Sequence, residues 1–206
     1  MLEMQIDRSL QRLRVDHVDL VQLHSCNRAI LEKGDAIRVL QKARDAGKTR
    51  CIGYSGDGQD AVYAIETGAF DTLQTSVSIA DLEAIDLTLP RAVRRNMGVI
   101  AKRPIANAVW RTGAKPASPY HHEYWRRIEL LQYDFLRRGV DHAVSIALRF
   151  TLAQPGVATA IVGTTNPDRW AANGRLLEAG PLGAAELRAV RERWASVATP
   201  EWVGQI

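Results

Sequence analysis

The sequence predicts an α/β fold built on a parallel sheet, and three observations lead to this prediction. Short runs rich in Val and Ile alternate with longer segments of helical periodicity. The short runs are nearly continuous in apolar character, which is typical of parallel strands that are covered on both faces. Polar residues gather just after these runs. The 206 residues are expected to form a single domain, 1–206.

Five segments are predicted to be strands. Each is short, contains β-branched or other apolar residues, and leads into a polar or glycine-containing turn. In chain order they are residues 17–23 (HVDLVQL), 49–55 (TRCIGYS), 71–77 (DTLQTSV), 97–102 (MGVIAK) and 159–164 (TAIVGT).

Helices are predicted between the first four strands. Residues 34–48, 58–68 and 86–96 have helical periodicity. Gly47 ends the first of these helices, because glycine readily adopts the left-handed conformation that follows a helix.

Two further helices are predicted before the last strand. Ser118 in front of Pro119 begins a helical segment that is expected to run through Arg138. Asp141 is expected to cap a second helix, which stops at Pro155.

The end of the chain is also predicted to be helical. Asn166 is expected to cap a helix that has Pro167 at its first position. Residues 180–194 supply a last amphipathic helix.

The composition excludes several classes of function. Lys and Arg number 27 against 23 Asp and Glu, for a net charge of +4, and they are scattered rather than grouped, so no nucleic-acid partner is expected. This modest surplus suits an anionic small molecule such as a phosphorylated cofactor. Cys26 and Cys51 form no CxxC pair and are interpreted as reduced thiols. Without a signal peptide or a membrane-spanning run, the protein is expected to be soluble and cytoplasmic.

The parallel sheet could be an open doubly wound sheet or a (β/α) barrel. The doubly wound dinucleotide-binding fold calls for G-x-G-x-x-G after a strand, and the only glycine cluster, GYSGDG at 53–58, has the wrong spacing. The barrel is favoured because polar residues follow the carboxyl ends of the strands, where barrel enzymes build their sites. These residues are His24-Ser25, Ser55-Gly56, Ser76, Lys102-Arg103 and Thr164-Thr165.

Five stretches of the chain resemble, in this order, the second part of the aldo-keto reductases. They are SLQRLRVDHVDLVQLH (9–24), AGKTRCIGYS (46–55), TLQTSVS (72–78), GVIAKRP (98–104) and IVGTTNPDRWAAN (161–173). The resemblance implies a (β/α)₈ barrel of the TIM type that reduces a small-molecule carbonyl with hydride from NADPH. This chain would hold about five of its eight βα units.

The resemblance assigns a catalytic role to one residue, His24. It matches a histidine that orients the carbonyl, and a neutral imidazole can donate one hydrogen bond to the oxygen as negative charge grows there. The alternative is a packing or rim histidine. The adjacent His121 and His122 are interpreted as a solvated helix face, and no metal site is expected.

The remaining site residues are implied to bind the cofactor. Ser55 and Gln74 match residues that contact the nicotinamide carboxamide. Lys102 stands where many members have an aromatic residue, so it is expected near the pyrophosphate together with Arg103 and Asn107. A solvated loop is the alternative for this pair of basic residues.

The last helix of the resemblance would hold the adenosine end of the cofactor. Arg169 and Asn173 are four residues apart, and they match the pair that contacts the 2′-phosphate and the adenine. Thr164 is counted as a cofactor contact with them. A helix N-terminus favours a phosphate. Gly163 replaces a frequent lysine, so NADP(H) is expected and NAD(H) is the alternative.

The catalytic Asp, Tyr and Lys of the family precede the stretch with which this resemblance begins. Two hypotheses follow: a truncated NAD(P)H-dependent reductase that is inactive or weak as an isolated chain, or a non-catalytic nucleotide-binding or interaction module. The first and last strands would leave open sheet edges, which predict pairing with a second copy or with a complementing segment.

Overall fold

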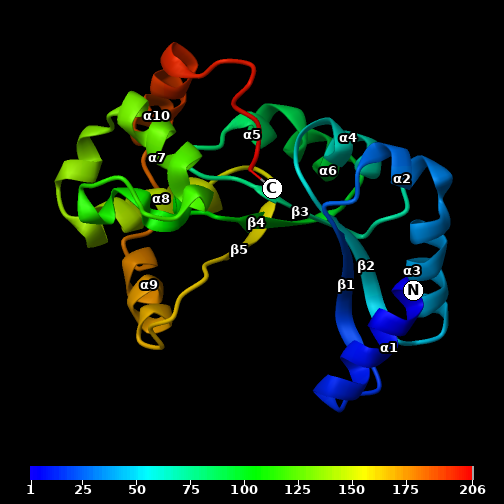
Figure 1. Ribbon diagram of the computed structural model, residues 1–206. Coiled ribbons are helices and arrows are strands. Elements are labelled where there is room, and N and C mark those ends of the chain that lie inside the picture. Colours follow the sequence, from blue (N-terminus) through cyan, green and yellow to red (C-terminus); the bar gives the residue numbers. More distant parts are fainter. Residues whose placement is uncertain (206) are drawn as a thin grey trace.

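Five parallel strands form one sheet in residues 1–205, the part of the chain that the computed structural model describes. They lie side by side in chain order (Figure 1). This arrangement confirms the predicted parallel α/β fold. The strands are β1 (Val18–His24), β2 (Thr49–Ser55), β3 (Thr72–Ser76), β4 (Gly98–Lys102) and β5 (Val157–Ile161).

The last strand begins and ends earlier than predicted. β5 pairs with β4 up to the partners Ile161 and Lys102, and β4 ends at Lys102. Beyond that point the chain has no neighbouring strand to pair with on this side, so residues 162–164 belong to the following loop.

Helices connect the strands and continue after β5. They are α1 (Leu2–Leu13), α2 (Arg28–Lys33), α3 (Asp35–Asp45), α4 (Gly58–Glu66), α5 (Glu83–Leu87), α6 (Leu89–Arg94), α7 (His122–Leu131), α8 (Val140–Leu152), α9 (Arg169–Leu177) and α10 (Ala184–Val197). Three 3₁₀ segments lie between β4 and α8: η1 (Ala106–Thr112), η2 (Pro119–His121) and η3 (Asp134–Arg137).

The two faces of the sheet have opposite characters. Leu23, Tyr54, Leu73 and Val99 are register partners on one face, and all four are buried where α3, α4 and α6 cover the sheet. Side chains alternate along a strand, so the next register row points to the other face. That row starts with His24, which is exposed. One face is therefore the hydrophobic core, and the other is partly open to solvent.

Several predicted helices start or stop at different residues. The segment after Ser118 is not one helix: α7 ends at Leu131, and Gln132 adopts a left-handed conformation with φ of 44°. The chain turns there because the Tyr133 side chain enters the core, where its hydroxyl donates to the carbonyl of Ile79. Asp141 is not a cap, because α8 begins at Val140 after Gly139.

A buried contact between Arg127 and Asp81 lies between the sheet and α7. The Arg127 guanidinium is completely buried and pairs with the Asp81 carboxylate, which also accepts a hydrogen bond from the Tyr124 hydroxyl. Burial raises the pKa of Asp81 to about 7, and the favourable charge of Arg127 only partly opposes this effect.

The C-terminal tail is held by the same group of side chains. Arg127 donates to the carbonyl of Val203 over 2.7 Å, and the backbone N–H of Gly204 donates to Glu83 over 3.1 Å. Trp202 lies against the guanidinium of Arg127. Figure 1 shows the tail running from α10 back toward the middle of the sheet.

The raised pKa of Asp81 predicts how stability depends on pH. Because the folded pKa of about 7 exceeds the ordinary value of about 3.9, the folded chain keeps a proton that the unfolded chain has lost. The stabilisation from Asp81 is therefore complete below about pH 4 and is lost as the pH rises toward 7. When the free energy of unfolding is measured in urea at several pH values, Asp81→Asn should reduce the slope of this free energy against pH. The exposed Asp19→Asn should keep it, and an equal slope in all three proteins would contradict the prediction.

Candidate functional site

Three of the predicted site residues lie in one register row at the carboxyl ends of the strands. His24 is the Cα partner of Ser55, and Ser55 is the partner of Gln74. The Gln74 amide donates to the Ser55 hydroxyl over 3.2 Å. His24 is exposed, with Nδ1 3.3 Å from the hydroxyl of Ser25. The row therefore offers an imidazole, a hydroxyl and an amide on the same face of the sheet.

Lys102 has a different environment from the one expected. Its ammonium lies 2.7 Å from the carboxylate of Asp57, and both side chains are almost completely buried. The same carboxylate accepts from the Thr75 hydroxyl at 2.8 Å and from the backbone N–H of Ser76 at 2.6 Å. A buried ammonium needs such a partner. Lys102 is consequently absent from the described residues that line the cavity beyond β4 and β5.

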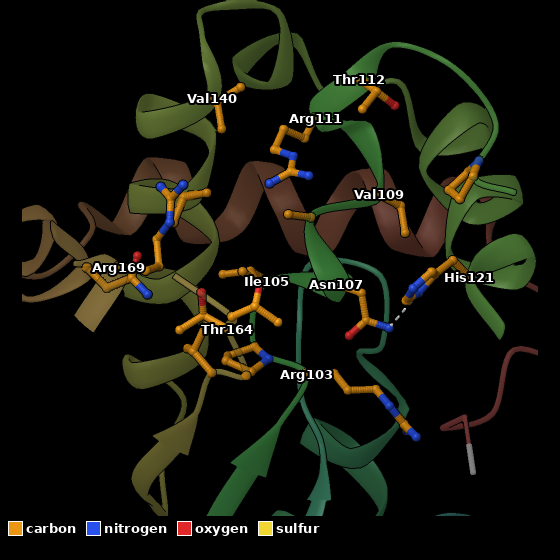
Figure 2. Close-up of a pocket in the computed structure, with 18 of the residues that line it drawn as sticks. Arg103, Ile105, Asn107, Val109, Arg111, Thr112, His121, Val140, Thr164 and Arg169 are labelled. Carbon is orange, nitrogen blue, oxygen red and sulfur yellow. Dashed lines mark hydrogen bonds between the residues drawn. The ribbon is translucent and has the colours of Figure 1, made fainter. Parts of the chain in front are cut away.

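That cavity has a volume of about 760 Å³. It lies past the ends of β4 and β5, between the loop after β4 and the start of α9 (Figure 2). Five predicted cofactor residues line it: Arg103, Asn107, Thr164, Arg169 and Asn173. The volume is in the range of pockets for small molecules and cofactors.

The charged residues described in the cavity lining are all basic. Its described lining contains four basic residues, Arg103, Arg111, Lys115 and Arg169, and no Asp or Glu. Cationic walls around a partly enclosed space raise the local concentration of anions. The cavity is therefore suited to a phosphate-bearing ligand.

Arg103 lines the cavity, but its guanidinium is directed away from Thr164 and Arg169 (Figure 2). It donates to the Tyr120 hydroxyl over 2.9 Å, to the Ser76 hydroxyl over 3.2 Å and to the carbonyl of Gln205. These partners already occupy the donors that were expected to bind a pyrophosphate.

The start of α9 differs from the prediction. Asn166 accepts from the backbone N–H of Asp168, so Pro167 and Asp168 form a turn and the helix begins only at Arg169. The guanidinium of Arg169 lies 3.9 Å from the exposed carboxylate of Asp141. Thr164 accepts from the N–H of Asn166 and so stabilises the same turn.

Asn173 has an unpartnered buried atom. Its side chain is 8% exposed, and its carbonyl oxygen accepts no hydrogen bond from residues 1–205. A buried polar atom without a partner costs about 1–3 kcal/mol, so this oxygen is suited to a donor on a ligand in the cavity.

The loop after β4 has a strained backbone. Ala106, Asn107 and Ala108 have φ angles of 44°, 56° and 49°, a left-handed turn without glycine. Each such residue costs about 1–2 kcal/mol relative to the right-handed conformation. Strain of this kind is concentrated at ligand-binding sites, where the surrounding contacts maintain it.

Sequence reasoning missed several residues of the cavity. Arg111 and Lys115 lie in the loop after β4, outside the recognised motifs. The interpretation of the two histidines as a solvated face was wrong, because His121 contacts the Asn107 amide at 3.3 Å and His122 contacts the carbonyl of Pro116 at 2.9 Å. Both rings are half-buried.

The structure thus combines an incomplete parallel β/α barrel with a cavity past the carboxyl ends of β4 and β5, where barrel enzymes build their sites. The chain belongs to the aldo/keto reductase family, whose model matches residues 1–195. The predicted family is thereby confirmed. The match covers the whole sheet and the cavity.

Known proteins support the same assignment. The chain is 27% identical over 176 residues to L-galactose dehydrogenase of Arabidopsis thaliana, which covers 78% of this chain and 53% of that protein. The chain thus spans about half the length of this curated relative.

Two solved structures show the fold. The apo form of an aldo-keto reductase from Bacillus halodurans has a TM-score of 0.79 at 22% identity, over 97% of this chain and 70% of that one. Glycerol dehydrogenase from Gluconobacter oxydans has a TM-score of 0.68 at 21% identity, over 97% and 66%. These neighbours are TIM barrels, and the five strands agree with the incomplete barrel that was predicted.

Among the described helices, none has the length and apolar character of a membrane-spanning segment.

The ion pair between Asp57 and Lys102 leads to a prediction about stability. Asp57→Asn leaves a buried ammonium unpaired and should lower the free energy of unfolding by about 3 kcal/mol. The double variant Asp57→Asn/Lys102→Met removes both charges and should recover part of this loss. As a control, Asp86→Asn breaks an exposed pair with Arg191 and should cost less than about 1 kcal/mol. Equal losses for the buried and the exposed pair, measured by urea unfolding, would refute the prediction.

Proposed function

We propose that this chain is the cofactor-binding part of an NAD(P)H-dependent aldo-keto reductase that reduces the carbonyl group of a small molecule. The cationic cavity beside α9, with its unpartnered Asn173 oxygen, is the main support for the proposal. NADP(H) is the proposed cofactor because Arg169 can pair with a 2′-phosphate, which NAD(H) lacks. When bound, the cofactor supplies the hydride.

The residues of this chain would divide the binding task between two places. Arg169, Asn173 and Thr164 line the cavity and would hold the adenosine end. Ser55 and Gln74 lie in the register row of His24, where a hydroxyl and an amide can hold a carboxamide.

His24 is the proposed catalytic residue of this chain. Reduction adds a hydride to the carbonyl carbon, and the oxygen then requires a proton. The exposed imidazole of His24 can donate a hydrogen bond to that oxygen and stabilise its developing charge.

A general acid is harder to find in this chain. Within residues 1–205, burial raises the pKa of Tyr54, Tyr124 and Tyr133, which makes each a poorer proton donor at neutral pH. Their hydroxyls already donate to Cys26, Asp81 and Ile79. This observation favours a binding module as the second candidate function if no acid comes from another polypeptide segment.

Partner binding through the sheet edges is part of the same proposal. β1 and β5 each have one neighbouring strand among the described residues, and the side chains of Thr159 and Ile161 on β5 are exposed. Unpaired backbone groups beside exposed apolar side chains favour association with a second copy or with a complementing segment.

The 2′-phosphate role of Arg169 can be tested by cofactor titration. Arg169→Ala should weaken NADPH binding at least about tenfold more than NADH binding, because a charge-assisted contact is worth about 1.5–3 kcal/mol. The neighbouring Trp170→Ala, which removes an exposed side chain outside the cavity, is the control. Equal losses for the two cofactors would remove Arg169 from this role.

Residues 1–206 alone are expected to show no turnover of carbonyl substrates. A general acid typically contributes about 10²–10⁴ in rate, and the three buried tyrosines Tyr54, Tyr124 and Tyr133 already donate their hydroxyl protons to Cys26, Asp81 and Ile79. The test is NADPH oxidation with a panel of aldehydes, combined with light scattering to measure the oligomeric mass. Robust turnover by a monomer would contradict two predictions: that this chain lacks a general acid, and that its open sheet edges cause association.

A further inference from the structure

We propose that Arg103 binds a carboxylate group of the substrate, and that this group takes the place of the C-terminal tail at the guanidinium. The substrate class is then a carbonyl compound with a carboxylate at its far end. The inference rests on the proposed carbonyl reduction beside His24 and deepens it. The site lies outside the cavity, because the guanidinium is directed away from Thr164 and Arg169 (Figure 2).

The charge of Arg103 has no acidic partner within residues 1–205. The side chain is half-buried, and its guanidinium donates to the hydroxyls of Tyr120 and Ser76 and to the carbonyl of Gln205, which are all neutral groups. A carboxylate can accept two parallel hydrogen bonds from a guanidinium, and a single carbonyl cannot. A carboxylate is therefore a better partner for Arg103 than the tail.

The two hydroxyls fix the guanidinium without help from the tail. Tyr120 accepts from Nε at 3.1 Å and from Nη2 at 2.9 Å, and Ser76 accepts from Nη1 at 3.2 Å. Gln205 is the third partner. When a ligand displaces Gln205, the other two contacts keep the guanidinium in place, so the ligand meets a preorganised donor.

The tail is held at the rim by a close backbone contact. At Gly204 the tail passes so near to Asp57 that a Cβ atom added there would collide with the Asp57 side chain. Asp57 cannot move aside, because Lys102 and Thr75 hold its carboxylate. A single methyl group on the tail should therefore lift it from the rim, and this gives a way to open the site without changing Arg103.

The position of Arg103 relates it to the row of His24. Its partner Ser76 follows Gln74 by two residues on β3, so both side chains point to the face of the sheet that carries His24. Neighbouring strands lie about 4.7–4.9 Å apart, so β1 and β3 are separated by about 10 Å. A substrate with its carbonyl beside His24 thus reaches Arg103 only with a group at its opposite end.

The charge at this place matches a carboxylate better than a phosphate. Lys102 is the adjacent cation in the chain, and Asp57 neutralises it over 2.7 Å. Arg103 then contributes one uncompensated positive charge, which equals the single charge of a carboxylate. A phosphate monoester carries about −1.5 to −2 at pH 7.

The test uses 4-acetylbenzoate and its methyl ester, which share the ketone and the ring and differ in the carboxylate. Ligand-observed NMR titrations of the wild-type chain should give at least about tenfold tighter binding for the acid. Arg103→Gln should bind the two ligands equally. Gly204→Ala should bind the acid more tightly than the wild type does, because its tail no longer competes.

The control is Arg188→Gln, which removes one positive charge at an exposed position of α10 and should behave like the wild type. Thermal unfolding checks that each variant folds. Hydrogen exchange of the wild type supplies a second readout. The backbone N–H of Gly204 donates to Glu83, so it should exchange faster with the acid bound and should not respond to the ester.

The outcomes separate this inference from the proposed function. Equal binding of acid and ester by the wild type overturns the inference. A preference for the acid that persists in Arg103→Gln also overturns it, because another group would then hold the carboxylate. Failure of Gly204→Ala to bind the acid more tightly overturns the competition with the tail. If the acid preference depends on Arg103 but NADPH does not bind, the carboxylate site stands and the proposed reductase function fails.

Discussion

The carboxylate of Asp57 is the contact on which the arrangement of the rim depends. It accepts hydrogen bonds from Thr75 and from the backbone of Ser76, and it pairs with Lys102. A single side chain from the loop after β2 thus fixes the ends of β3 and β4. Because both side chains are almost completely buried, a displacement that separates them would leave the ammonium of Lys102 without a counter-charge. The cavity begins with the residue after Lys102, so this ion pair also sets where the chain leaves the sheet.

The sheet and one part of the site could be predicted from the sequence because both follow from strand periodicity. Apolar runs gave the five strands, and the side-chain alternation of parallel strands brings His24, Ser55 and Gln74 into one row. Lys102 was misplaced because its partner Asp57 lies on another strand's loop. No local pattern reports which of several acidic residues a buried lysine will meet.

The loop after β4 could not be predicted for a different reason. Ala106, Asn107 and Ala108 adopt a conformation that residues other than glycine usually avoid, so residue type argues against the turn that forms. Arg111 follows this turn and His121 contacts Asn107 within it, so the positions of both side chains could not be predicted without it. The scattered charge of the sequence becomes a cluster only because the fold brings the two loops after β4 and β5 together.

The polarity of the open sheet face has a consequence for handling by the cell. Chaperones and apolar dyes recognise broad apolar surfaces, whereas this face presents the exposed imidazole of His24, with Ser55 buried and Gln74 half-buried beside it. This face of the sheet therefore lacks the apolar surface by which incompletely folded proteins are usually detected. The β5 edge differs, because Ile161 is exposed there beside backbone groups with which another β-strand could pair.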